Sequence, residues 1–82
     1  MIRVVIADDH HLVRKGVRAL LESEGDIEVV GEASTGQEAI ELVAANKPHV
    51  VVMDISMPRM DGTQAAEQIL GIPVAHLVLP GV

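Results

Sequence analysis

Four short apolar runs, which alternate with stretches of helical spacing, constrain the fold of this chain more than any other feature. The runs cover residues 4–7, 27–31, 49–54 and 73–79. The first of them, residues 4–7, is a continuous apolar run, which suits a strand that is buried on both faces of a sheet, and the others also read as strands. Strands that alternate with helices predict a parallel sheet with right-handed crossovers. We therefore predict an α/β fold with helices on both faces and the order βαβαβαβ.

The first helical stretch covers residues 12–24 and ends at Gly25, which favours a helix stop. Apolar residues in this stretch recur at i, i+4, i+7 and i+8, which defines one face of a helix. We expect this face to pack on the sheet. Its members are Val13, Val17, Leu20 and Leu21.

Capping signals define the other two helices. Thr35 and Glu38 have the spacing of a capping box, in which each side chain accepts the other's free backbone N–H. That helix ends before Pro48, because proline disfavours a helical residue before it. Asp61 can cap the third helix, and Gly71 is a natural stop at its end.

Size and composition limit the class of protein. The chain has 82 residues, no Cys and no aromatic residue, so we expect one domain, residues 1–82, with a small aliphatic core. Its formal net charge is −6, which opposes contact with nucleic acid or anionic membranes. The N-terminus reads as a strand and lacks the pattern of a signal peptide. These features predict a soluble cytoplasmic protein.

Three acidic residues stand at the carboxyl ends of expected strands, where open α/β sheets bind ligands. Asp8 and Asp9 close the first strand, and Asp54 closes the third. If these strands are neighbours, three carboxylates converge, and like charges favour a bound cation such as Mg²⁺. A carboxylate beside Mg²⁺ can accept a phosphoryl group. The plainer alternatives are that Asp9 caps the first helix and that Asp54 precedes a turn.

Other polar residues carry weaker signals. His10 and His11 are adjacent, so they cannot form the i, i+4 pair of a zinc helix, and we expect solvated residues near the acids. Arg14, Lys15 and Arg18 form a basic patch, whose default interpretation is a solvated face. The chain has no Gly-rich phosphate loop. A Mg²⁺-dependent phosphatase is a further alternative, but no second nucleophile or general base is placed near the acids.

Two segments resemble a known family. The sequence VVIADDH at residues 4–10 is similar to the start of a response-regulator receiver domain, and residues 50–62, VVVMDISMPRMDG, are similar to its phosphorylation strand and loop. Residues 8–16 and 30–36 resemble the NarL/LuxR-type subgroup, which usually joins its receiver to a DNA-binding domain and regulates transcription. The resemblance covers residues 1–70 and implies a flavodoxin-like receiver fold, truncated on its C-terminal side.

The resemblance also implies roles for individual residues. Asp54 would accept a phosphoryl group from a histidine kinase or a small phosphodonor, as a phosphorelay component rather than an enzyme. Asp9 would bind Mg²⁺ most directly, and Asp8 would assist, often through water. The main-chain carbonyl of Ser56 would be a further ligand. In the family the first helix often meets the kinase, which gives its basic patch a second interpretation.

The resemblance weakens after residue 70. Receivers end their fourth strand with a Ser or Thr, whereas this chain has Leu79, Pro80 and Gly81, and the family's Lys after a fifth strand is missing. A sheet edge left bare invites pairing with another chain. We therefore expect a homodimer or larger assembly, formed for instance by exchange of elements. The alternative function is a non-switching receiver fragment whose main property is self-association.

Overall fold

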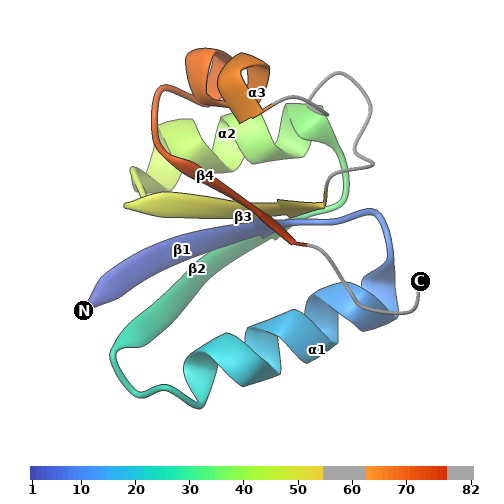
Figure 1. Ribbon diagram of the computed structural model, residues 1–82, viewed down its shortest axis with the longest axis vertical. Helices are drawn as coiled ribbons and strands as arrows, with labels where there is room; N and C mark the ends of the chain where they lie inside the picture. The colour runs from blue at the N-terminus through green and yellow to red at the C-terminus, as the bar shows by residue number, and fades with distance from the viewer. Residues whose placement is uncertain (55–62, 78–82) are drawn as a thin grey trace.

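The computed structural model describes residues 1–54 and 63–77, and along them strands alternate with helices. The strands form one parallel sheet in the order β2-β1-β3-β4 (Figure 1). This arrangement confirms the predicted α/β fold and the order βαβαβαβ. The elements are β1 (Ile2–Ala7), α1 (His11–Glu22), β2 (Ile27–Ala33), α2 (Gly36–Asn46), β3 (Val50–Asp54), α3 (Thr63–Leu70) and β4 (Val74–Leu77).

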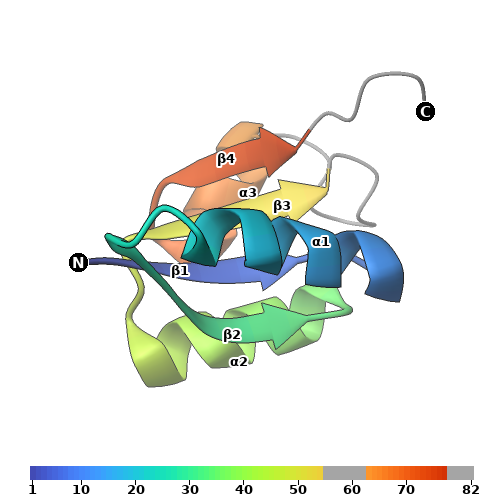
Figure 2. The ribbon, with the colours of Figure 1, turned by 90° about the horizontal axis from the view of Figure 1, so that it is seen from below.

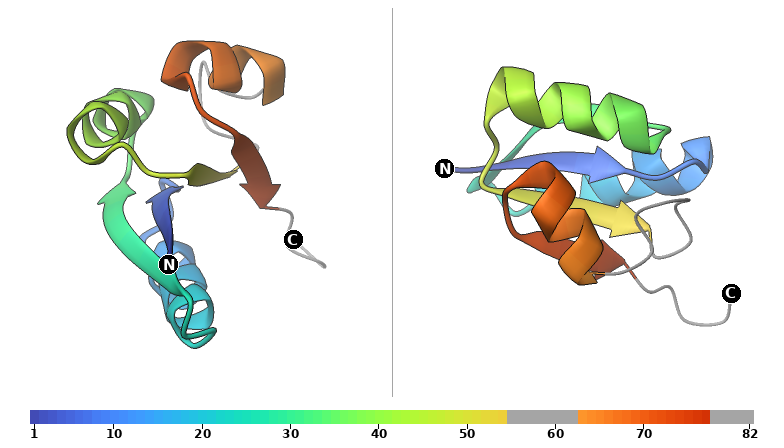
Figure 3. Two further views of the ribbon diagram at one scale, coloured as in Figure 1. Left: turned by 90° about the vertical axis from the view of Figure 1, so that its left-hand side faces the viewer. Right: turned by 90° about the horizontal axis from the view of Figure 1, so that it is seen from above.

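Helices cover both faces of the sheet, with α1 on one face and α2 and α3 on the other (Figures 1 and 3). Alternate side chains of β1 pack against the helices on opposite faces of the sheet, because successive residues of a strand point to opposite faces. Val4 and Ile6 pack with Val17 of α1, whereas Val5 and Ala7 join the cluster under α2 and α3. This division explains why residues 4–7 of β1 are apolar at every position.

The start of α2 follows the capping signal in the sequence. The Thr35 hydroxyl oxygen accepts the N–H of Glu38 at 3.1 Å, as the capping box predicts. The Glu38 carboxylate bonds in return with the backbone of Thr35, and it also accepts the N–H of Ser34 at 2.9 Å. Bonds from the Ser34 hydroxyl and backbone lower the pKa of Glu38. The predicted helix start and its capping box are therefore confirmed, and Ser34 is an additional partner of Glu38.

Strand β2 runs two residues further than the sequence pattern predicts, to Ala33. The register of its pairing shifts between Val4 and Val5, so that Val5 faces Gly31. A Cβ atom at Gly31 would lie 3.0 Å from a methyl carbon of Leu42, so the absence of a side chain lets α2 pack closely there. The extension carries Glu32 to the carboxyl edge of the sheet, where the acidic residues lie. Strand β4 begins at Val74, and residues 78–79 of its predicted span lie outside the described residues.

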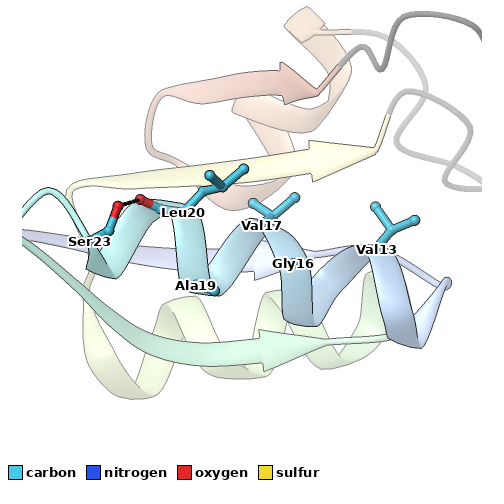
Figure 4. A pocket seen from close by; sticks show the side chains of 6 residues that line it. All are labelled: Val13, Gly16, Val17, Ala19, Leu20 and Ser23. Carbon is cyan, nitrogen blue, oxygen red and sulfur yellow. Dashed lines mark hydrogen bonds between the residues drawn. The ribbon is translucent and has the colours of Figure 1, made fainter.

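On the apolar face of α1, one residue differs from its predicted position. Leu20, predicted to pack on the sheet, is 70% exposed. Its side chain lines a shallow apolar groove of about 570 Å³ along α1 (Figure 4). Within the described ranges, no helix covers β4 on the side of α1 (Figure 2). The apolar face of α1 is therefore wider than the part of the sheet on which α1 packs. The groove is lined by Val13, Gly16, Val17, Ala19, Leu20 and Ser23.

Candidate functional site

Three carboxylates meet at the carboxyl edge of the two central strands. Strands β1 and β3 are parallel neighbours, and Ala7 pairs with Met53, so the residues that follow them lie side by side. Oxygen atoms of Asp8, Asp9 and Asp54 and a ring nitrogen of His10 lie within 4.8 Å of one another. The predicted convergence of the acids is therefore confirmed.

The three acids differ in their access to solvent. The Asp8 side chain is 3% exposed, that of Asp54 is 16% exposed and that of Asp9 is 49% exposed. Asp9 does not cap the first helix, because the residue at the N-cap is His10 and its first turn receives no side-chain cap. The plain structural role considered for Asp9 is thus absent. Asp8 is thus the buried member of the cluster, and Asp9 is its most exposed carboxylate.

His10 is part of this cluster. Its Nδ1 atom lies 3.2 Å from Asp8, 3.0 Å from Asp9 and 3.6 Å from the nearest oxygen of Asp54. The hydrogen bond with Asp8, followed by the negative charge of Asp9, raises the pKa of His10. The ring is 65% exposed, as expected for a solvated residue, but sequence reasoning missed its contact with the acids. Its position directly after Asp9 is the signal that could have indicated this contact.

The donor set fits a hard cation. Three carboxylates surround one small volume, and the imidazole of His10 already lies against all of them. Carboxylate oxygens are the ligands that Mg²⁺ prefers. The remaining predicted ligand, the main-chain carbonyl of Ser56, lies outside the described residues, as does the predicted helix cap Asp61.

A second charged cluster lies beside the acids. Glu32 of β2 accepts hydrogen bonds from Arg14 at 3.0 Å, Lys15 at 3.1 Å and Arg18 at 2.6 Å. The basic patch of α1 is therefore turned toward the sheet and is not simply a solvated face. Burial alone would raise the pKa of Glu32, but the bonds from Arg18, Lys15 and Arg14 outweigh it and lower the pKa to about 2. Sequence reasoning missed Glu32, because its pairing with α1 depends on the extension of β2.

This ion cluster predicts a pH-dependent stability. The pKa of Glu32 falls from 4.5 to about 2 on folding, so its contribution is complete above pH 4.5 and is lost as the pH falls toward 2. Exposure of Lys15 and Arg18 screens the cluster, so we expect a contribution on the order of 2 kcal/mol at neutral pH. We expect Glu32→Gln to destabilise the chain by this amount at pH 7 and by less than half of it at pH 3, in urea unfolding followed by far-UV circular dichroism.

Glu28→Gln is the matched control, because Glu28 is an exposed carboxylate on the same strand. It should change the unfolding free energy little at either pH. An equal loss for Glu32→Gln at pH 7 and pH 3 would contradict the role of the charged carboxylate.

The fold and the acidic edge agree with a comparison to known families. The model of the response regulator receiver domain matches residues 4–79, and the chain belongs to this family. The receiver is the phosphoryl-accepting module of two-component response regulators, so the class of function is phosphorelay signal transduction. Receivers interact with histidine kinases and phosphodonors, and they mostly lack an enzymatic activity of their own. The predicted family and fold are thereby confirmed.

Individual relatives indicate the type of response regulator that this chain resembles. The chain is 56% identical over 66 residues to the uncharacterized transcriptional regulatory protein YhcZ of Bacillus subtilis, covering 80% of this chain and 31% of the relative. It is 51% identical over 69 residues to the transcriptional regulatory protein LiaR of the same organism, covering 84% and 33%. The signal receiver domain of the response regulator NarL from Mycobacterium tuberculosis has a TM-score of 0.75 at 40% identity, covering 96% and 69%.

These matches place the chain among the LuxR/NarL-type regulators. The chain spans about a third of the length of the curated relatives. In the described part of the structure, no helix is both long enough and apolar enough to cross a membrane. The activities of the full-length relatives are thus not transferred to this chain directly.

Proposed function

We propose that this chain is a cytoplasmic phosphorelay receiver in which Asp54 accepts the phosphoryl group from a histidine kinase or a small phosphodonor. The observation that carries this proposal is the position of Asp54 at the end of β3, against Asp8 and Asp9 and open to solvent on one side. We propose that residues 1–82 form a single receiver domain, and that its chemistry is limited to its own phosphorylation.

The acceptor step is a direct displacement. A carboxylate oxygen of Asp54 forms a bond to phosphorus while the bond to the leaving group breaks, which releases acetate when the donor is acetyl phosphate. Asp8 lies buried beside the acceptor. The exposed side, next to Asp9 and His10, leaves room for the donor.

Asp8, Asp9 and Asp54 would hold Mg²⁺, with the main-chain carbonyl of Ser56 as a further ligand. Bound there, the ion would offset the negative charges of the acceptor carboxylate and of the phosphoryl oxygens. The close approach of three carboxylates supports this proposal, because such a group binds a divalent cation more readily than it tolerates full ionisation alone.

The test is the intact mass of the chain after incubation with acetyl phosphate. We expect a mass gain of one phosphoryl group in the presence of Mg²⁺ and none when a chelator is added. The absence of a gain in a chain that circular dichroism shows to be folded would contradict the proposal.

A second candidate function is self-association, and the surface of α1 favours it. The apolar groove along α1 includes the exposed Leu20, and β4 lies at an edge of the sheet. An exposed apolar groove and a sheet edge are surfaces that a second copy of the chain can bury. We propose a homodimer that covers this groove. In the non-switching alternative, this dimer is the main property of the chain.

Size-exclusion chromatography with light scattering tests the dimer. We expect a dimer at micromolar concentration, which Leu20→Lys converts to a monomer because it places a charge in the groove. Leu12→Lys is the control, because Leu12 is 84% exposed and does not line the groove. A folded monomer before any substitution would contradict this second proposal.

A further inference from the structure

Arg14 connects the two charged clusters of the molecule. Its Nε atom donates to the Glu32 carboxylate at 3.0 Å, and its Nη1 atom donates to the main-chain carbonyl of Asp8 at 2.7 Å. The Arg14 side chain is 13% exposed, so both bonds are largely shielded from water. A guanidinium presents several N–H donors in a rigid plane, and fixing one bond therefore orients the other.

Glu32 anchors this guanidinium from the side of β2. One oxygen of the carboxylate accepts a hydrogen bond from Arg14, and the other accepts hydrogen bonds from Lys15 and Arg18. The Glu32 side chain is 11% exposed and remains ionised, since its pKa is about 2. The orientation of Arg14 is therefore set by a largely shielded, charged partner, which Lys15 and Arg18 of α1 also bind.

Asp8 is held at three points. Its N–H donates to the carbonyl of Ala33 at 2.9 Å, and its carboxylate accepts the N–H of His10 at 2.7 Å. The bond from Arg14 to its carbonyl is the third. A fixed carbonyl fixes the plane of the peptide that joins Asp8 to Asp9, because the peptide unit is planar. The direction of the Asp9 side chain depends on that plane.

We propose that Arg14 is a positioning residue of the phosphoryl-acceptor site, which acts by fixing the Asp8–Asp9 peptide so that both carboxylates face Asp54. This inference rests on the proposed function. It assigns different roles to the three cations that bind Glu32. Arg14 links Glu32 to the site, whereas the hydrogen bonds of Lys15 and Arg18 involve Glu32 and, for Arg18, Glu22.

The test compares Arg14→Met with Arg18→Met, since each variant removes one cation from Glu32. The measurements are the Kd for Mg²⁺, with magnesium chloride as the probe in isothermal titration calorimetry, and the amide chemical shifts of Asp9 and His10. We expect Arg14→Met to weaken Mg²⁺ binding about tenfold and to move both amide signals. Arg18→Met should lower the thermal stability and leave the Kd within about twofold.

Conservative variants keep the test decisive if a Met variant does not fold. Lysine at position 14 keeps the charge, but an ammonium on a flexible stem does not reproduce the planar fork that joins Glu32 to Asp8. We expect Arg14→Lys to fold and to bind Mg²⁺ more weakly than Arg18→Lys does.

Two outcomes overturn the inference. Equal Mg²⁺ affinity of the Arg14 variants and the unsubstituted chain would overturn it, and so would an equal loss in the Arg14 and Arg18 variants. In both cases the unsubstituted chain binds Mg²⁺ and the proposed function stands. Failure of the unsubstituted chain to bind Mg²⁺ would overturn the proposed function and the positioning role together.

Discussion

Asp54→Asn is expected to reduce phosphoryl acceptance from acetyl phosphate to background while the chain stays folded. An amide oxygen is a poor nucleophile, so the acceptor is lost although the shape of the side chain is kept. The substitution also removes one of three clustered negative charges, which relieves repulsion in the absence of a cation. The melting temperature in a metal-free buffer should therefore be unchanged or higher. Intact-mass spectrometry and thermal unfolding measure the two effects.

Two further variants test whether the loss of phosphorylation is specific to Asp54. Asp9→Asn should keep the acceptor but require at least about tenfold more Mg²⁺, because a direct ligand is lost. Asp26→Asn is the matched control, since Asp26 is an exposed aspartate in the turn before β2. Phosphorylation of Asp54→Asn at the rate of the Asp26→Asn control would disprove the assignment of the acceptor.

Met53→Ala is expected to cause the largest loss of stability. Met53 is completely buried at the centre of the sheet, where it packs with Val51, Ala66 and other residues of the cluster under α2 and α3. Truncation of a buried methionine costs about 2–5 kcal/mol. A domain of this length has a total stability of roughly 4–12 kcal/mol. The variant should consequently unfold at much lower urea concentration, in a transition followed by far-UV circular dichroism.

Val52→Ala is the control for this prediction. Val52 is the next residue of the same strand, but it points to the α1 face and is only half-buried. We expect a cost of about 1 kcal/mol. Equal losses for the two variants would show that the two faces of the sheet contribute alike, against the asymmetry that the helices create.

The fold was predictable because local signals and overall topology agree. Apolar runs predicted the strands, and the spacing in α1 and the cap at Thr35 predicted helices that the structure confirms. The exposed position of Leu20 was not predictable, since periodicity identifies the apolar face of a helix but not the width of the surface that covers it. The extension of β2 was missed for a similar reason, because Gly31 and Glu32 look like the end of a strand in isolation.

The acidic residues of the site were predictable because strand ends of a parallel sheet meet at one edge. Once β1 and β3 are neighbours, Asp8 and Asp54 must approach each other. The contacts of His10 and Arg14 were not predictable from spacing. They depend on the path of the turn after β1 and on the position of α1 over β2, which tertiary packing sets.

The central claim is that the phosphoryl group is carried by Asp54, and the most direct test is to locate it. Borohydride reduces an aspartyl phosphate to homoserine, which marks the modified residue permanently. Trypsin then separates residues 4–14, which contain Asp8 and Asp9, from residues 19–59, which contain Asp54. Tandem mass spectrometry should find homoserine at position 54 and only after incubation with acetyl phosphate and Mg²⁺. Homoserine at Asp8 or Asp9, or at no position in a folded chain, would contradict the account.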